Sequence, residues 1–487
     1  MNAFDYFFEN TNRLETLFLV GTESISFNDL YDSSLQLADR LSAEVGQKQN
    51  VLLISANNLF FIKAYLAILK SGNICIPIDP GIEKENFLYI SDITKPKLIF
   101  ATSDISRKLP IDIFNCLFPE SINSNSNYTI ERTENETIDD NDCAEIIFTS
   151  GSTGKPKGVM LSHKNLVANT SSILSYLNLN QLDRMLVVLP FYYCYGLSLL
   201  HTHIRTGGSI VLNNSFIFLG KIIKDLLDYK CTGFAGVPSH FQLLLRKSDS
   251  FKKTAFPALR YVTQAGGGLA TTFIDEFRES FPEVKFYVMY GQTEATARLS
   301  YLEPDMYELK KGSIGKGIPG VELNIVNNKN VNVTPGETGE IIARGDNIML
   351  GYYPDSEMSP NMVFDNWLFT GDLGTIDDDG YIYLTARKKE IIKVGGKRIS
   401  PKEIESVILQ VPGVIDCVVE GISDKLIGES VKAWILINKN QDSDTVLEMV
   451  KQKCIMNLAI HKIPRFFEFS THFSISSTGK KKVQKKD

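Results

Sequence analysis

Short apolar runs alternate with helix-length segments through the first 150 residues of the chain. Strand-like runs lie at residues 51–55, 74–78, 97–101 and 145–148. Before the first of these runs, a helix is expected to begin after Ser26, its N-cap, and to continue to Leu41. A second helix is expected at residues 60–69, between the first two runs. Parallel strands need such long crossover connections. The alternation therefore predicts parallel sheets with helices on their faces, which is an α/β architecture.

The pattern changes in the second half of the chain. Short strands with Gly and Asn turns between residues 322 and 353 predict a small β-subdomain, and residues 374–383 predict a hairpin. After the polar run 386–390, a helix is expected at 401–409 and strands at 416–420 and 430–437. We therefore expect a mixed α/β and α+β fold, with a large N-terminal domain (1–387) and a small C-terminal domain (388–487).

Composition narrows the class of protein. The 487 residues exceed what one hydrophobic core supports, and 43% hydrophobic with 22% charged residues is ordinary for a globular enzyme. The net charge of -6 gives no general attraction to nucleic acid, and no apolar run is long enough for a membrane span. Seven scattered cysteines without a C-x-x-C pair fit a reducing cytosol. We expect a cytoplasmic protein without a nucleic-acid partner.

A glycine-rich segment follows the strand at 145–148. Glycines let a backbone approach an anion closely, hydroxyls donate hydrogen bonds, and lysines supply charge, which together suit a polyphosphate. The spacing differs from the P-loop, because Pro156 stands where that loop needs Ser or Thr. A plain Gly/Ser surface loop is the alternative, although two lysines are unusual in one. The candidate phosphate-binding residues are Thr149, Ser150, Gly151, Ser152, Thr153, Gly154, Lys155 and Lys157.

This segment resembles the phosphate-binding signature of the adenylate-forming superfamily, which includes acyl-CoA synthetases, luciferases and the adenylation domains of nonribosomal peptide synthetases. Further motifs match in the expected order as far as Lys480. Residues 290–294 resemble the motif Y-G-x-T-E of that superfamily. The resemblance implies that Tyr290 and Gly291 adjoin the nucleotide, with Tyr290 near the adenine. It also implies that Thr293 contacts the α-phosphate and that Glu294 holds Mg²⁺, for which a carboxylate is a suitable ligand.

Three more positions acquire nucleotide roles from the same resemblance. The T-G-D motif at 370–372 makes Asp372 the acceptor for both ribose hydroxyls, and Arg387 stands at the position of a second ribose contact. Residues 476–480 resemble the catalytic-lysine motif, although Ser474 replaces the usual preceding proline. Lys480 would then bridge the attacking carboxylate and the α-phosphate and offset the charge that builds between them.

The resemblance also implies a rotation of the small domain between two half-reactions. Lys389 falls on the hinge position of the superfamily. Gly395, Gly396 and Arg398 match the segment that lines the entry path of the thiol, where glycines leave room for a pantetheine arm.

Two segments are expected to shape the pocket for the acid. Tyr193 stands where many family members have a gating histidine, and Tyr195 lies close by. Gly266, Gly267 and Gly268 are expected to run along the substrate. The first segment lacks the aspartate that holds an α-amino group in peptide synthetases. This absence favours a fatty, acyl or aryl acid over an α-amino acid.

Together these motifs predict an AMP-forming ligase that uses ATP and Mg²⁺ to convert a carboxylic acid to an acyl adenylate and then transfers the acyl group to a thiol, most simply that of coenzyme A. One alternative is an acyl-AMP ligase that loads the phosphopantetheine of a separate carrier protein. Another is a non-catalytic nucleotide-binding homologue, since fold alone does not decide function. A kinase-like phosphotransferase would explain only the glycine loop.

Overall fold

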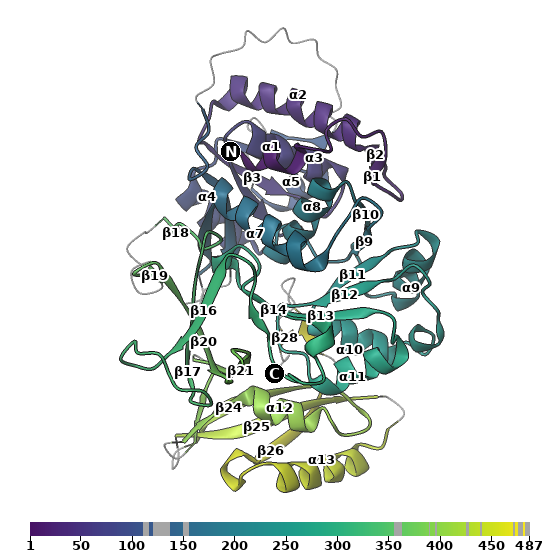
Figure 1. Cartoon of the computed structure of the whole chain (residues 1–487), viewed down its shortest axis with the longest axis vertical. Coiled ribbons are helices and arrows are strands. Elements are labelled where there is room, and N and C mark those ends of the chain that lie inside the picture. The colour runs from purple at the N-terminus through teal and green to yellow at the C-terminus, as the bar shows by residue number, and fades with distance from the viewer. Residues whose placement is uncertain are drawn as a thin grey trace.

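The computed structural model describes residues 1–110, 116–119, 137–149, 155–354, 363–388, 390–394, 397–424, 428–438, 441–470, 473–475 and 481–482. These residues form a large N-terminal domain and a small C-terminal domain, which lies at one end of the long axis of the molecule (Figure 1). The large domain contains two mixed sheets with helices around them and a separate β-subdomain. The predicted fold class is therefore confirmed.

The first sheet of the large domain is built from strands of the first 162 residues and one later strand, Gly351–Tyr353. Its strands at residues 50–54, 74–78 and 98–101 are mutually parallel and almost wholly buried, which explains their continuous apolar sequences. The spatial order of its seven strands is β18 (Gly351–Tyr353), β8 (Lys157–Ser162), β7 (Cys143–Thr149), β4 (Ile74–Ile78), β3 (Asn50–Ile54), β5 (Leu98–Ala101) and β6 (Cys116–Leu117).

Helices occupy the intervals between these strands, as the alternating pattern predicted. The Ser26 hydroxyl accepts a hydrogen bond from the Asp29 amide, so Ser26 is the predicted N-cap, and its helix continues past Leu41 to Val45. The helices of this region are α1 (Ala3–Phe8), α2 (Phe27–Val45), α3 (Leu59–Lys70), α4 (Lys84–Thr94) and α5 (Ser103–Lys108).

The second sheet has nine strands and a parallel centre. In spatial order they are β15 (Lys316–Gly317), β14 (Ser300–Leu302), β13 (Lys285–Tyr290), β12 (Tyr261–Gln264), β11 (Gly233–Gly236), β9 (Arg184–Val187), β10 (Ser209–Leu212), β1 (Leu17–Leu19) and β2 (Ile25–Ser26). Its connecting and neighbouring helices are α7 (His163–Leu177), α8 (Cys194–Thr206), α9 (Leu219–Asp228), α10 (Pro238–Lys247) and α11 (Thr271–Ser280).

The β-subdomain is a five-stranded antiparallel sheet, and it contains the predicted hairpin. Its strands are β16 (Val321–Val326), β17 (Gly339–Gly345), β19 (Val363–Phe364), β20 (Trp367–Ile376) and β21 (Ile382–Arg387). The prediction is wrong for the end of the segment 322–353, because β18 leaves the subdomain and pairs with β8 of the first sheet. This pairing satisfies backbone groups of β8 that would otherwise form a sheet edge.

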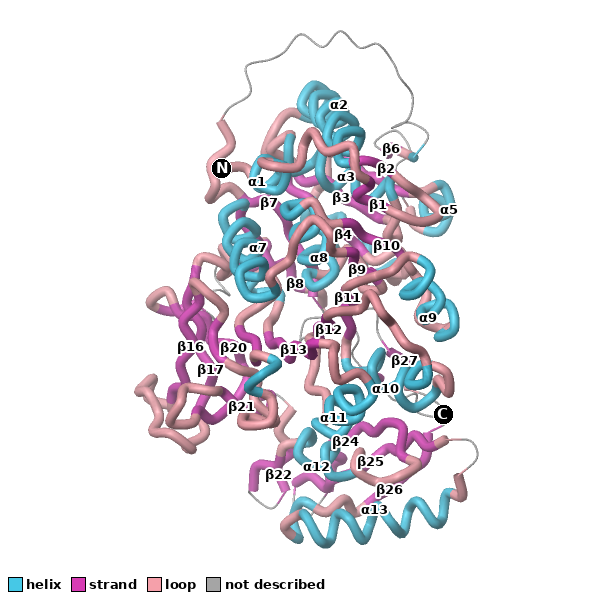
Figure 2. The backbone as a smooth tube through the Cα atoms, turned by 45° about the vertical axis from the view of Figure 1, so that its right-hand side comes forward, coloured by secondary structure: helices cyan, strands magenta, loops and turns pink. Residues whose placement is uncertain are grey.

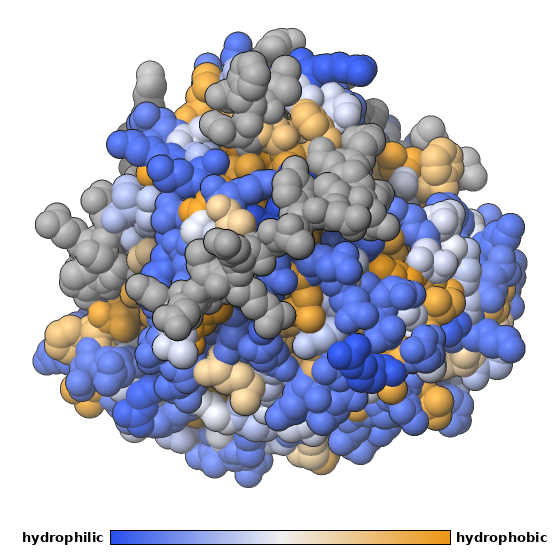
Figure 3. Space-filling view, turned by 90° about the horizontal axis from the view of Figure 1, so that it is seen from above, coloured by the Kyte–Doolittle hydropathy of each residue, from blue (hydrophilic) through white to orange (hydrophobic). Residues whose placement is uncertain are grey.

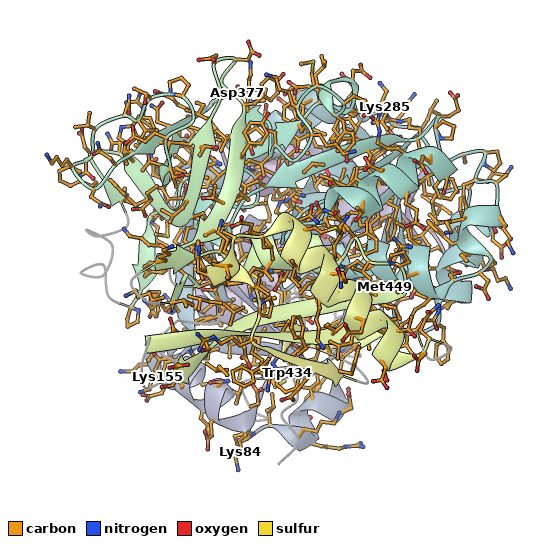
Figure 4. The ribbon with its side chains drawn as sticks, turned by 90° about the horizontal axis from the view of Figure 1, so that it is seen from below. Lys84, Lys155, Lys285, Asp377, Trp434 and Met449 are labelled. Carbon is orange, nitrogen blue, oxygen red and sulfur yellow. The ribbon has the colours of Figure 1, made fainter. Side chains whose placement is uncertain are left out.

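The small domain packs two helices against an antiparallel sheet that one parallel strand extends. Its elements are β22 (Ile392–Val394), β23 (Lys397–Ile399), α12 (Pro401–Ile408), β24 (Val414–Asp424), β25 (Gly428–Ile437), α13 (Ser443–Asn457) and β26 (Phe466–Ser470). Buried side chains of both helices share one apolar cluster with alternate residues of β25, so α12 and α13 pack on the same face of this sheet. Figure 2 shows α12 nearer to the large domain and α13 farther from it. In Figure 4, Trp434 and Met449 mark this domain in front of the large domain. The predicted helix and both predicted strands of this region are confirmed.

The surface seen from above is mostly hydrophilic, with smaller apolar patches between the polar side chains (Figure 3). Within the described ranges, no helix combines the length and the apolar character that crossing a membrane requires.

A buried polar cluster lies inside the large domain. The Tyr65 hydroxyl is 2.9 Å from Glu145 Oε2 and 2.7 Å from His201 Nε2, and the Phe7 ring stacks on His201. Burial raises the pKa of the Glu145 carboxyl to about 7, and it lowers the pKa of the His201 imidazole to about 3. A protonated Glu145 can donate to Tyr65, which can in turn donate to a neutral His201, so an uncharged cluster satisfies all three groups.

We predict that Glu145→Gln flattens the dependence of stability on pH. The folded state keeps the Glu145 proton between pH 4.5 and about 7, where the unfolded chain loses it. The stabilisation present below this window is therefore lost as pH rises through it, by roughly 3 kcal/mol in total. Urea unfolding at pH 5 and pH 8 should show the variant gaining stability relative to the wild type only at pH 8. An identical pH slope for the two proteins would contradict the prediction.

Candidate active site

Tyr290, Asp372 and Arg387 come together from three different strands. Tyr290 ends β13, and its hydroxyl donates a hydrogen bond of 2.8 Å to Asp372 Oδ2 on β20. Arg387 ends β21, where it stands opposite Asp372 in the antiparallel register, and its Nε lies 3.2 Å from Asp372 Oδ1. The structure thus joins the predicted adenine-side tyrosine and both predicted ribose contacts in one cluster.

The surroundings of the Asp372 carboxyl shift its pKa in opposite directions. Burial raises its pKa, whereas the positive charge of Arg387 and the Tyr290 hydrogen bond act in the opposite direction. Among the described residues, each of its oxygens has one side-chain partner and can accept further hydrogen bonds. A carboxylate fixed by two partners is suited to accept two neighbouring hydroxyls of a sugar.

The loop after Tyr290 presents the Glu294 carboxylate beside a second tyrosine. The Tyr352 hydroxyl donates a 2.7 Å hydrogen bond to Glu294 Oε1, and the Met349 amide donates to the Glu294 carbonyl. Thr293 is buried, and its Oγ1 lies 3.6 Å from Cys194 Sγ at the start of α8. Glu294 is only partly buried, so a hard, negatively charged oxygen donor remains available, which fits the proposed Mg²⁺ ligand.

Gly291 is required by the close approach of two backbone segments in this loop. A Cβ atom at this position would lie 2.1 Å from the Ala297 carbonyl oxygen. Real Cβ atoms do not approach a backbone oxygen so closely, and the oxygen cannot move without displacing the chain. Gly291 therefore sets the course of the loop that carries Thr293 and Glu294.

The glycine-rich segment reaches this cluster at Lys157, near one of its two described ends. Thr149 and Lys157 face each other across the pairing of β7 with β8. Lys157 Nζ lies 5.4 Å from the centre of the Tyr352 ring, the same ring whose hydroxyl contacts Glu294, and Lys155 Nζ lies 5.1 Å from the Tyr89 ring. The remaining candidate residues of the segment, Ser150, Gly151, Ser152, Thr153 and Gly154, lie outside the described residues.

The candidate pocket residues differ in their exposure to solvent. Tyr193 precedes α8 and is partly buried, and burial raises the pKa of its hydroxyl. Tyr195 is fully buried, with its hydroxyl bonded to Thr263 of β12. Residues 266–268 follow β12 and are exposed, as expected of a segment that borders a ligand.

Several predicted positions cannot be placed in this cluster. Lys389, Gly395, Gly396 and Lys480 lie outside the described residues. The backbone of Arg398 is described, and it pairs with Lys393 across β22 and β23 of the small domain. The hinge, thiol-path and catalytic-lysine roles therefore stay predictions, as does the domain boundary at residues 387 and 388.

The structure adds three side chains that the sequence motifs did not reveal. Tyr352 contacts Glu294, and Glu340 accepts hydrogen bonds from the Gly371 amide and from Lys388. Arg298 is buried against Tyr195. Each lies outside a recognised motif and reaches the site through tertiary packing. Only Arg298 carried a local signal, since it is a lone charged residue in the apolar stretch after residues 290–294.

A two-domain α/β fold that joins these motifs in this order defines an adenylate-forming enzyme. The model of the AMP-binding enzyme family matches residues 8–353, and the model of the AMP-binding enzyme C-terminal domain matches residues 403–480. The chain therefore belongs to the AMP-binding enzyme family.

Individual relatives span most of the chain. An oxalate–CoA ligase of Arabidopsis thaliana is 28% identical over 483 residues, which cover 94% of this chain and 92% of the relative. A 2-succinylbenzoate–CoA ligase of Bacillus licheniformis is 32% identical over 338 residues, which cover 69% of this chain and 68% of the relative. Among solved structures, an anthranilate CoA ligase in complex with anthranoyl-AMP has a TM-score of 0.90 at 23% identity, covering 99% of this chain and 95% of that one. This last likeness shows the shared fold.

We predict that Gly291→Ala is strongly destabilising and inactive. The added methyl group must displace the Ala297 carbonyl, at a cost of roughly 3 kcal/mol or more. Gly220→Ala is the matched control, because a Cβ at that position meets nothing within 4 Å. Thermal unfolding and nucleotide binding should be impaired in the first variant and unchanged in the second. A Gly291→Ala protein as stable as the control would contradict this account of the loop.

Proposed function

We propose that this protein is an AMP-forming acid–thiol ligase. Attack of a substrate carboxylate oxygen on the α-phosphorus of ATP forms the acyl adenylate and releases pyrophosphate. A thiol then attacks the acyl carbon, the thioester forms, and AMP leaves. The observation that carries the proposal is the convergence of Tyr290, Asp372 and Arg387 close to the loop that presents Glu294.

Each of these residues has a role that its surroundings support. Asp372 and Arg387 would bind the ribose hydroxyls, and Tyr290 would hold Asp372 in place while its ring borders the adenine. Glu294 would hold Mg²⁺, which supplies charge neutralisation on the phosphates. Thr293 would contact the α-phosphate, and the segment from Thr149 to Lys157 would enclose the outer phosphates. Such positioning and charge neutralisation are the main requirements of the first half-reaction.

The small domain supplies the remaining proposed groups. Lys480 would bridge the substrate carboxylate and the α-phosphate in the first step, and Gly395, Gly396 and Arg398 would line the thiol path in the second. One small domain cannot present both groups to one site at the same time, so it would rotate about Lys389 between the steps.

Coenzyme A is the acceptor that the comparisons favour. The named relatives include oxalate–CoA and 2-succinylbenzoate–CoA ligases, and a solved relative from Bacillus subtilis is described in complex with ATP and a magnesium ion. These names support ATP, Mg²⁺ and coenzyme A as ligands of this chain. We also expect the protein to lie in the cytoplasm. A carrier protein acting in trans is the competing acceptor.

The test is acid-dependent pyrophosphate release by the purified full-length protein with ATP and Mg²⁺. A panel of fatty, aryl and small acids is offered, with hydroxylamine to trap the acyl adenylate. We expect at least one acid to stimulate release, and Lys480→Ala to lower the rate at least about 100-fold because it removes a charge that stabilises the transition state.

Parallel reactions with coenzyme A identify the acceptor. Acyl-CoA should appear in the reactions that release pyrophosphate. Adenylate without thioester would instead favour a carrier protein. Absence of both pyrophosphate release and ATP binding would contradict the proposed function and favour a non-catalytic homologue.

A further inference from the structure

Arg298 carries a buried positive charge without an acidic partner among the described residues. It lies between residues 290–294 and β14, and only 2% of it is exposed. Taking a charged group out of water costs several kcal/mol, so buried arginines normally pair with carboxylates. Even Arg260, which is only partly buried, forms an ion pair of 2.6 Å with the buried Asp183. Arg298 forms no such pair with any acid in the part of the chain that the structure describes.

The described groups that contact the Arg298 guanidinium are neutral. Its guanidinium carbon lies 3.9 Å from the centre of the Tyr195 ring, so a cation–π contact covers one face. The polar contacts are weak or long, and they involve Met289 Sδ at 3.4 Å, the Ala297 carbonyl at 3.3 Å, Ser198 Oγ at 3.5 Å and the hydroxyl of Tyr176. A guanidinium has five N–H donors and does not lose its proton in proteins. Among the described residues, the positive charge of Arg298 therefore has no negative partner, and some of its N–H donors have no strong acceptor.

The position of Arg298 relative to the reacting groups is set by helix α8. Cys194 at the start of α8 touches Thr293, whereas Ser198, which contacts Arg298, lies four residues further on. Residues four apart lie on the same face of a helix, about 6 Å apart along its axis. Burial raises the pKa of the Cys194 thiol to about 11, and Arg298 and Glu294 act on it in opposite directions, so both charges lie near this helix start.

We propose that Arg298 binds a second carboxylate of the acid substrate and thereby selects a short dicarboxylic acid. This inference rests on the proposed function, in which the first carboxylate reacts near Thr293. The second carboxylate then lies one helical turn away, where it can accept a bidentate hydrogen bond from the guanidinium. Tyr195 and Ser198 orient the guanidinium from the side of α8.

The test compares diacids with monoacids of equal carbon number. Malonate, succinate and glutarate are paired with propanoate, butanoate and pentanoate, and kcat/KM for acid-dependent pyrophosphate release is measured in each case. We expect the wild-type protein to favour one diacid over its partner by at least about 100-fold, as for a buried charge pair. Arg298→Met should lose about this factor on the diacid and leave the monoacid within a few-fold, which inverts or abolishes the preference.

Two further variants separate recognition from folding. Arg205→Met is the matched control, because Arg205 also stacks on a tyrosine, Tyr6, but pairs with Glu9 at the far end of α8. It should keep the wild-type preference. Arg298→Lys keeps the charge without the fork of donors, and it should retain a weakened preference for the diacid even if Arg298→Met does not fold.

The outcomes distinguish this inference from the proposed function. A wild-type protein that activates monoacids as well as or better than diacids, with Arg298→Lys unchanged in its preference, would overturn the role of Arg298 and leave the ligase function intact. Failure of the wild-type protein to release pyrophosphate with any of these six short acids, while a fatty or aryl acid still stimulates release, would overturn the role of Arg298 alone. Absence of pyrophosphate release with every acid, together with absence of ATP binding, would overturn both.

Discussion

The hydrogen bond from Tyr290 to Asp372 links the nine-stranded sheet to the β-subdomain at the point where the candidate site forms. β13 delivers Tyr290 at its carboxyl end, and the register of β20 with β21 places Arg387 opposite Asp372. From Tyr290 the chain turns directly into the loop of Glu294, which Gly291 allows to pass against Ala297. A change in either sheet would therefore move the proposed ribose and magnesium contacts together.

The local elements of the fold were largely predictable from sequence because their causes are local. Ser26 caps its helix through its own side chain, and the buried parallel strands are continuous apolar runs. The destination of β18 was not predictable. Its sequence favours a strand, but whether it joins the β-subdomain or the edge of the first sheet depends on partners almost 200 residues away.

The site likewise contains residues that the sequence could predict and residues that it could not. Tyr290, Glu294, Asp372 and Arg387 lie in or near contiguous motifs, so their participation was predictable by resemblance although their mutual contacts were not. Tyr352, Glu340 and Arg298 reach the site only through folding. A motif common to a family says little about which acid a member activates. Substrate choice is therefore to be sought in packing rather than in motifs.

The central claim is that Asp372 binds the ribose of the nucleotide, and calorimetric titration with ATP and with 2′,3′-dideoxy-ATP tests it most directly. The wild-type protein should bind ATP at least about 10-fold more tightly, because hydrogen bonds to a charged group are lost with the hydroxyls. Asp372→Ala should bind both nucleotides weakly and equally, whereas Asp377→Ala, on the hairpin turn, should keep the wild-type preference. If Asp372→Ala retained that preference, the account of the site would be wrong.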